Sequence, residues 1–127
     1  MHPFEKTVLY TDANGFARFR TETIALDGGS DAARLSDLMQ SDGYQLRRSP
    51  VGFRSAFHCT TTPQWVFILQ GAMQIGLQDG TVRVFGKGEH FYSADHLPQD
   101  TSFDASVHGH WSAQFGQDEL VTLFVRT

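Results

Sequence analysis

Six histidines are the most chemically versatile residues of this 127-residue chain, and three of them stand where they could form a site. His58 precedes a Thr-rich segment and an apolar run that closes at Gly71, whereas His108 and His110 lie two residues apart near the C-terminus. Residues two apart on a β-strand face the same side, so we expect His108 and His110 to share a face. Neutral imidazoles bind metals and move protons near neutral pH.

A metal site would use His58, His108 and His110 around one divalent ion, with zinc, iron, nickel or manganese as the ions considered. Three imidazoles with an open position do form catalytic zinc sites. The nearby strand offers only Gln64, whose neutral amide does not offset the charge of a metal. The alternatives are a metal-free cavity with hydrogen-bonded imidazole walls, or acid–base chemistry by the same histidines.

These residues must be positioned by β-strands, because strand-forming runs alternate with turn signals along the chain. A short helical turn is expected only at 31–39, where Leu35, Leu38 and Met39 have near-helical spacing. The pattern predicts an all-β single domain over residues 1–127, as a barrel or jelly roll. The expected strand segments are 6–11, 16–26, 44–50, 51–60, 63–71, 72–86, 86–95, 107–115 and 120–127.

The clearest expected element is a hairpin over 72–86. Met73, Ile75 and Leu77 alternate with small or polar residues. Asp79-Gly80 is typical of a type I′ turn with φ > 0 at both positions. We expect Val82 and Val84 on the return strand to face the same side as the outgoing apolar residues.

From about residue 44 to the end, the chain resembles the small single-domain cupins. In the first cupin motif, Gly71 takes the place of the closing glycine and His58 that of the first histidine. Thr60 stands in place of the second histidine and Gln64 in place of the glutamate. The resemblance implies a double-stranded β-helix, or jelly-roll barrel, with a pocket inside it.

The second half of the resemblance begins after Gly88. The Ala94-Asp95 pair and the segment 109–112, with sequence GHWS, are similar to the ED…GH.S/T pattern of one cupin subgroup. In that subgroup a lone histidine on the first strand is followed six residues later by glutamine, as His58 is by Gln64. The resemblance implies that His110 is the histidine of the second motif.

The overall composition excludes several classes of function. The formal charge is −4, which argues against a basic nucleic-acid surface or a polybasic membrane patch. A single cysteine, Cys59, excludes an intramolecular disulfide framework. We find no signal-peptide pattern and no long apolar run, so we expect a cytoplasmic protein that does not span a membrane. Phenylalanine is frequent enough to suggest apolar outer surface, and hence a homodimer.

Together these patterns predict a protein that binds a small organic ligand in a pocket formed by His58, Thr60, Gln64, Tyr92 and His110. The missing glutamate and second histidine favour binding over catalysis. The alternative is a metal-dependent or acid–base enzyme, of isomerase, lyase or dioxygenase type, that uses His58 and His110. The presence of two histidines that could face each other favours this alternative.

Overall fold

The structure, a computed structural model, describes residues 2–127, in which eleven strands and no helix are present. The prediction of an all-β chain is confirmed. The strands are β1 (Phe4–Thr11), β2 (Ala17–Ile24), β3 (Gly28–Ser30), β4 (Ala33–Leu35), β5 (Tyr44–Ser49), β6 (Gln64–Gln70), β7 (Ala72–Gly76), β8 (Val82–Gly86), β9 (His90–Ala94), β10 (Trp111–Phe115) and β11 (Leu120–Arg126).

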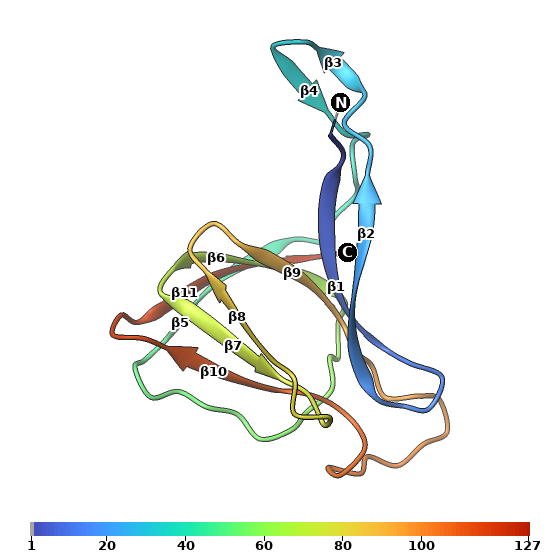
Figure 1. The fold of residues 1–127 in the computed structure, drawn as a ribbon, viewed down its shortest axis with the longest axis vertical. Helices are drawn as coiled ribbons and strands as arrows, with labels where there is room; N and C mark the ends of the chain where they lie inside the picture. Colours follow the sequence, from blue (N-terminus) through green and yellow to red (C-terminus); the bar gives the residue numbers. More distant parts are fainter. Residues whose placement is uncertain (1) are drawn as a thin grey trace.

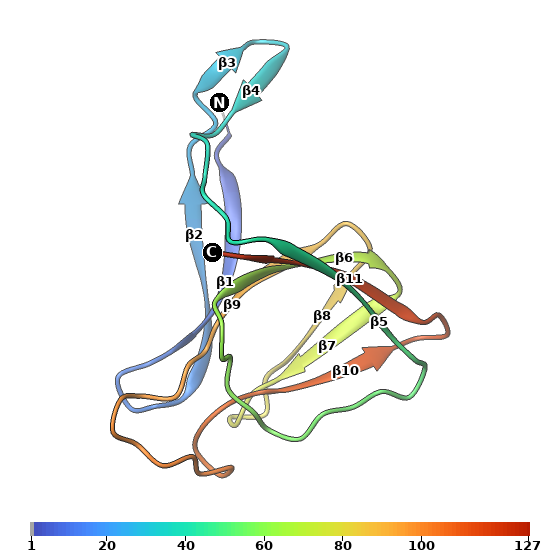
Figure 2. The same ribbon diagram turned by 180° about the vertical axis from the view of Figure 1, so that it is seen from behind.

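Two sheets form the body of the molecule. The larger has six strands in the order β2-β1-β9-β6-β11-β5, and the smaller has three in the order β10-β7-β8. Only β1 and β9 pair in parallel within these sheets; the other neighbours are antiparallel. Figures 1 and 2 show the smaller sheet lying across one face of the larger. The chain is therefore a mixed β-sandwich.

The apolar core lies between the two sheets, and each contributes alternate residues from its strands. The larger sheet supplies Leu9, Val66, Ile68, Phe91 and Leu120, and the smaller supplies Met73, Ile75 and Phe85. Alternation places the other residues of β6 on the opposite side of the larger sheet. We call that side the outer face, and Trp65 is buried on it by neighbouring side chains.

No closed barrel forms within the part of the chain that the structure describes. The segment 51–60, expected as a strand, runs beside β10 but forms only two isolated bridges, Arg54–Ala113 within β10 and His58–His110 just before it, with a few further backbone hydrogen bonds between them. The prediction of a continuous strand there was wrong. Pro50, Gly52 and the turn beside them break regular pairing, because proline has no amide hydrogen and Gly52 adopts a φ of 92°.

The expected helical turn at 31–39 was also wrong. Residues Ala33–Leu35 form β4, which pairs with β3 in a small hairpin. Leu35, Leu38 and Met39 are exposed, and none of them belongs to the core. A short helix gains its stability mainly from burying an apolar stripe, so near-helical spacing alone does not produce one here.

The 72–86 hairpin forms, but its turn differs from the prediction. Leu77 and Thr81 close a three-residue loop in which only Gly80 has positive φ, at 89°. The extra loop residue pairs Val82 with Gly76 rather than with Leu77. A one-residue slip reverses the facing of the return strand. Val82 and Val84 are therefore exposed, and Phe85 enters the core in their place.

Candidate functional site

A cavity of about 100 Å³ opens between the two sheets and contains the chemically active groups. Core side chains form its apolar wall. Its polar wall is formed by residues of both sheets and by His58 of the segment 51–60. The residues that line it are Arg47, His58, Gln64, Val66, Met73, Ile75, Phe91, Ser93, His110, Ser112 and Phe124.

His58 and His110 meet in this cavity although 51 residues separate them in the chain. Their backbones exchange two hydrogen bonds, of 2.9 and 3.0 Å, and their ring centroids lie 4.7 Å apart. Gly109 permits this approach, because a Cβ atom there would lie 2.6 Å from the carbonyl oxygen of His58. The glycine also has a φ of 85°, which a side chain would strain.

A buried carboxylate fixes the orientation of the His110 ring. Nδ1 of His110 donates to Oδ2 of Asp95 over 2.8 Å, and the Thr11 hydroxyl donates to the other carboxylate oxygen over 2.7 Å. Asp95 is 0% exposed and His110 is 4% exposed. Because the carboxylate engages Nδ1, Nε2 is the ring nitrogen of His110 that is left for a ligand.

The ring of His58 is held in the corresponding way. Its Nδ1 lies 3.0 Å from the carbonyl oxygen of Ala56, which can only accept, so Nδ1 donates and Nε2 is left free. The Ser55 hydroxyl lies 3.2 Å from the same nitrogen. Burial lowers the pKa of His58, and the neighbouring His110 lowers it further, although the hydrogen bond to Ala56 opposes them. The ring is therefore neutral at neutral pH.

Arg47 brings the only cationic side chain to the residues that line this cavity. It comes from β5, the edge strand of the larger sheet, and its guanidinium lies 4.8 Å from the ring centroid of Phe53. Stacking of this kind holds a guanidinium in place while its N–H groups stay available. Gln64 and two serines, Ser93 and Ser112, add neutral polar groups.

Three of the five residues expected in the ligand pocket line this cavity: His58, Gln64 and His110. Thr60 does not line the cavity; its hydroxyl is hydrogen-bonded over 2.7 Å to that of Ser93, which does. Tyr92 lies on the outer face, where it packs edge-on against Trp65 and its hydroxyl bonds to Thr127. Phe91 and Ser93 take the inward positions on β9.

His108 is not brought to the other two histidines. It precedes β10, and the positive φ of Gly109 ends the strand alternation that would have put it beside His110. Its Nδ1 accepts from the backbone amide of Asp104 over 2.9 Å, and its ring lies against Gly15. His108 thus orders the loop before β10, next to the turn between β1 and β2.

The cavity fits a resident metal ion poorly. It presents two imidazoles and one amide, whereas catalytic zinc sites use three protein ligands and iron sites add a carboxylate. The nearest carboxylate, Asp95, is engaged by His110 and Thr11. Among residues 2–127, no three His, Cys, Asp or Glu side chains are grouped so as to hold a metal. The cavity therefore offers too few ligands for the metal sites expected from the sequence.

Sequence reasoning missed Asp95 and Arg47 as site residues. Asp95 belongs to the pattern that supported the cupin resemblance, and its position before the GHWS segment was the available signal. Arg47 had no such signal in the sequence. Arg47 and Arg48 are adjacent, so alternation places one side chain on each face of the strand without showing which of them faces the cavity.

No protein-family model matches this chain, and no curated protein matches its sequence. Residues 2–127 contain no helix that is long and apolar enough to cross a membrane.

Proposed function

We propose that this chain is a cupin-like protein that binds a small organic anion, such as a short carboxylate, in the cavity between its two sheets. The observation that carries the proposal is the convergence of His58 and His110 on one cavity with Nδ1 of each ring already bonded. The two free Nε2 atoms can accept hydrogen bonds from a hydroxyl or acid proton of the ligand, and the anionic group itself would pair with Arg47. The space is apolar on its other side.

The size of the cavity limits the ligand. Pockets for drug-sized molecules occupy about 300–1,000 Å³. A cavity of about 100 Å³ suits a molecule with only a few non-hydrogen atoms. Arg47 favours an anionic head group, because a guanidinium pairs with the two oxygens of a carboxylate. The wall formed by Val66, Phe91 and Phe124 would receive a short apolar tail.

Titration with a series of short carboxylic acids, from acetate to glutarate, tests this proposal by nuclear magnetic resonance. Binding should move the side-chain signals of His58 and His110 in the same titration. Arg47→Met should weaken binding by about tenfold or more, since it removes the anion partner.

Arg83→Met is the matched control, because Arg83 also stacks on phenylalanine rings but lies on β8, away from the cavity. Equal loss of binding in the two variants, or no response of the histidine signals to any acid in the series, would contradict the proposal.

A second candidate function is acid–base catalysis on a bound carboxylate, of isomerase or lyase type. The pair of Asp95 and His110 favours it, because a carboxylate that holds Nδ1–H orients the ring and stabilises the imidazolium formed when Nε2 takes a proton. Hydrogen–deuterium exchange at the α-carbon of a bound acid tests this candidate without knowledge of the product. Exchange that is lost in His110→Gln supports catalysis, and binding without exchange leaves a binding protein.

The dioxygenase alternative requires a metal, and so does the metal-dependent form of the other two reactions. Elemental analysis of protein purified without an affinity tag tests that requirement. One equivalent of zinc, iron, nickel or manganese per chain, lost in His58→Gln, would show that the two imidazoles and Gln64 suffice. Ligand binding in the presence of a chelator supports the metal-free proposal instead.

A further inference from the structure

The outer face of the larger sheet is apolar over three adjacent strands. Register places Tyr44, Val125 and Trp65 in one cross-strand row and Leu46, Leu123 and Phe67 in the next. On β5, at the edge, Tyr44 is 75% exposed and Leu46 is 68% exposed. Apolar rows of this extent on a protein surface usually mark a contact with another molecule.

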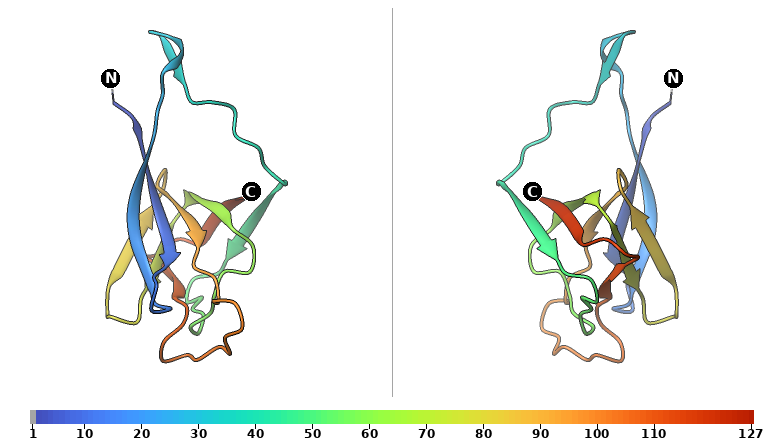
Figure 3. Two further views of the ribbon diagram at one scale, coloured as in Figure 1. Left: turned by 90° about the vertical axis from the view of Figure 1, so that its right-hand side faces the viewer. Right: turned by 90° about the vertical axis from the view of Figure 1, so that its left-hand side faces the viewer.

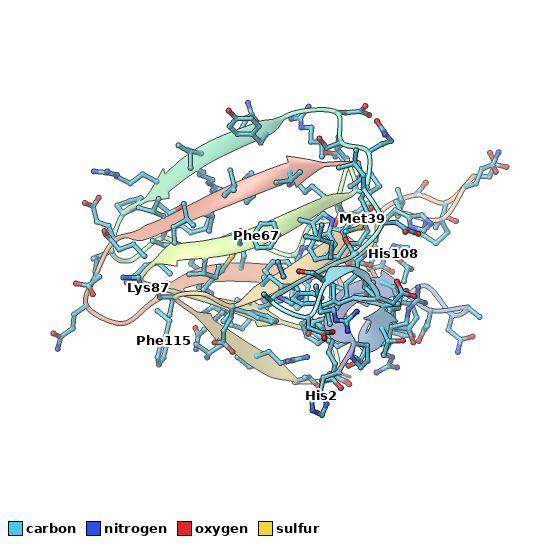
Figure 4. The ribbon with its side chains drawn as sticks, turned by 90° about the horizontal axis from the view of Figure 1, so that it is seen from above. His2, Met39, Phe67, Lys87, His108 and Phe115 are labelled. Carbon is cyan, nitrogen blue, oxygen red and sulfur yellow. The ribbon has the colours of Figure 1, made fainter. Side chains whose placement is uncertain are left out.

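A groove of about 440 Å³ lies on the same face. Its floor is formed by Trp65 and Phe67 of β6, and Met39 and Gln40 line it from the chain that leads into β5. Phe67 and Met39 are both labelled in Figure 4, which views the molecule from above. The groove is larger and more apolar than the cavity between the sheets, and it contains no histidine pair.

Residues 25–43, which we call the arm, project beyond the sandwich. Figures 1 and 3 show β3 and β4 at its far end and an open stretch of chain that arches back to β5. Every residue of β3 and β4 is exposed, and Leu38 is 90% exposed. A two-stranded hairpin with three-residue strands is at best marginal in water by itself. The part of the arm that carries β3, β4 and Leu38 therefore lacks, within one chain, the packing that would stabilise it, whereas Met39 and Gln40 at its base line the groove.

The charges of the arm complement those of the sheet edge. The arm carries four aspartates, Asp27, Asp31, Asp37 and Asp42, against one arginine, Arg34. Strand β5 has no acidic residue, and its Arg48 alternates to the same side as Tyr44 and Leu46, whereas Arg47 faces the cavity. Arg48 is exposed and lies 4.0 Å from Glu119 of its own chain. An acidic, apolar arm and a basic edge beside an apolar face are thus present on the same molecule. A two-fold axis would bring each arm to the partner's edge in the same way.

We propose that the outer face of the larger sheet is an interface between two copies of this chain. The arm of each copy covers the groove and the β5 edge of the other. Leu38 enters apolar surface that its own chain does not supply, and the arm carboxylates approach Arg48 of the partner. This proposal is independent of the ligand proposed for the cavity between the sheets.

Sedimentation of the full chain across the micromolar range tests the proposal, with an expected mass about twice the chain mass of 14.2 kDa. Leu38→Glu should raise the dimer dissociation constant by at least about tenfold. Its circular dichroism spectrum should not change, since that side chain is exposed in the single chain. Val84→Glu, at an exposed apolar position on the smaller sheet, should leave the dimer intact.

Charge reversal tests the placement of the arm. Arg48→Glu should weaken the dimer, and Asp37→Arg in the same chain should recover most of the loss, because opposite charges meet again. A wild-type monomer across the range would overturn the proposal, as would equal effects of Leu38→Glu and Val84→Glu. A monomer that binds an apolar dye in the groove would also overturn it, because the groove would then be open surface rather than an interface between two copies.

Discussion

At the scale of single residues, Asp95 controls the chemistry of the candidate site without facing the cavity. Its two carboxylate oxygens are divided between His110 and Thr11, and it is wholly buried. A buried acceptor that loses its donor, or the reverse, costs more than the hydrogen bond itself contributes. The state of His110 therefore depends on a residue outside the cavity lining.

Asp95→Asn should destabilise the fold by about 1–3 kcal/mol, because an amide satisfies Nδ1–H of His110 and the Thr11 hydroxyl less well than a carboxylate does. It should also move the His110 proton toward Nε2, since the new N–H₂ group favours an accepting Nδ1. Nitrogen-15 chemical shifts of the ring report the tautomer. Thr11→Val is the control: it removes the other hydrogen bond, so it should lower stability and leave the tautomer unchanged.

The pKa of His58 predicts a pH dependence of stability. Burial lowers that pKa below its ordinary value of 6.5, so the unfolded chain takes up a proton at higher pH than the native chain does. The unfolded state then binds more protons below about pH 6.5, and the free energy of unfolding falls as pH falls. His58→Gln should flatten this fall in urea titrations between pH 7 and pH 5.

A second histidine contributes in the same direction. Burial, followed by the charge of Lys6, lowers the pKa of His90 on the outer face. His58→Gln should therefore leave a residual slope, which His58→Gln combined with His90→Gln should remove. A slope unchanged by His58→Gln would mean that the ring does not resist protonation in the native state.

At the scale of elements, alternation predicted most strands but not the facing of every strand. Met73, Ile75 and Leu77 are buried as expected, because each lies on a strand paired on both sides or in the turn that continues it. Val82 and Val84 face outward because the loop has one residue more than a type I′ turn. The spacing of apolar residues along the return strand does not reveal the length of the loop, and valine is compatible with either face of a strand, so the facing could not be predicted.

The same limit applies to the site. His58 and His110 could be paired from the sequence only through the cupin resemblance, because no local pattern joins residues on separate strands. His108 was misplaced by assuming a continuous strand through Gly109, whose φ of 85° interrupts it. Asp95 follows the end of β9, where alternation gives no prediction of side-chain direction.

Gly80 provides a test of the turn that sets this register. Its φ of 89° disfavours a β-branched residue, although a Cβ atom there would meet open space. Gly80→Val should destabilise by about 1–3 kcal/mol through backbone strain alone. Gly80→Asn is the matched control and should cost less, because asparagine tolerates positive φ. Equal urea midpoints for the two variants would show that the strain is absent.

At the scale of the whole molecule, the two sheets share one core and should unfold together. Phe91 of the larger sheet packs against Phe85 of the smaller, with ring centroids 4.8 Å apart. The cavity lies beside this core, so any separation of the sheets would also separate His58 from the wall formed by β6 and β9. The integrity of the site thus depends on the cohesion of the sandwich.

Two tryptophans allow this cohesion to be measured, because Trp65 lies in the larger sheet and Trp111 in the smaller. Trp111→Phe leaves Trp65 as the reporter of one sheet, and Trp65→Phe leaves Trp111 as the reporter of the other. In each variant, at fixed protein concentration, the fluorescence transition in urea should coincide with the transition seen by far-ultraviolet circular dichroism, as for a single cooperative unit. If the Trp111 signal changed at lower urea than the dichroism, the smaller sheet would detach first. The cavity would then open before the larger sheet unfolds, and ligand binding should be lost at that same lower urea concentration.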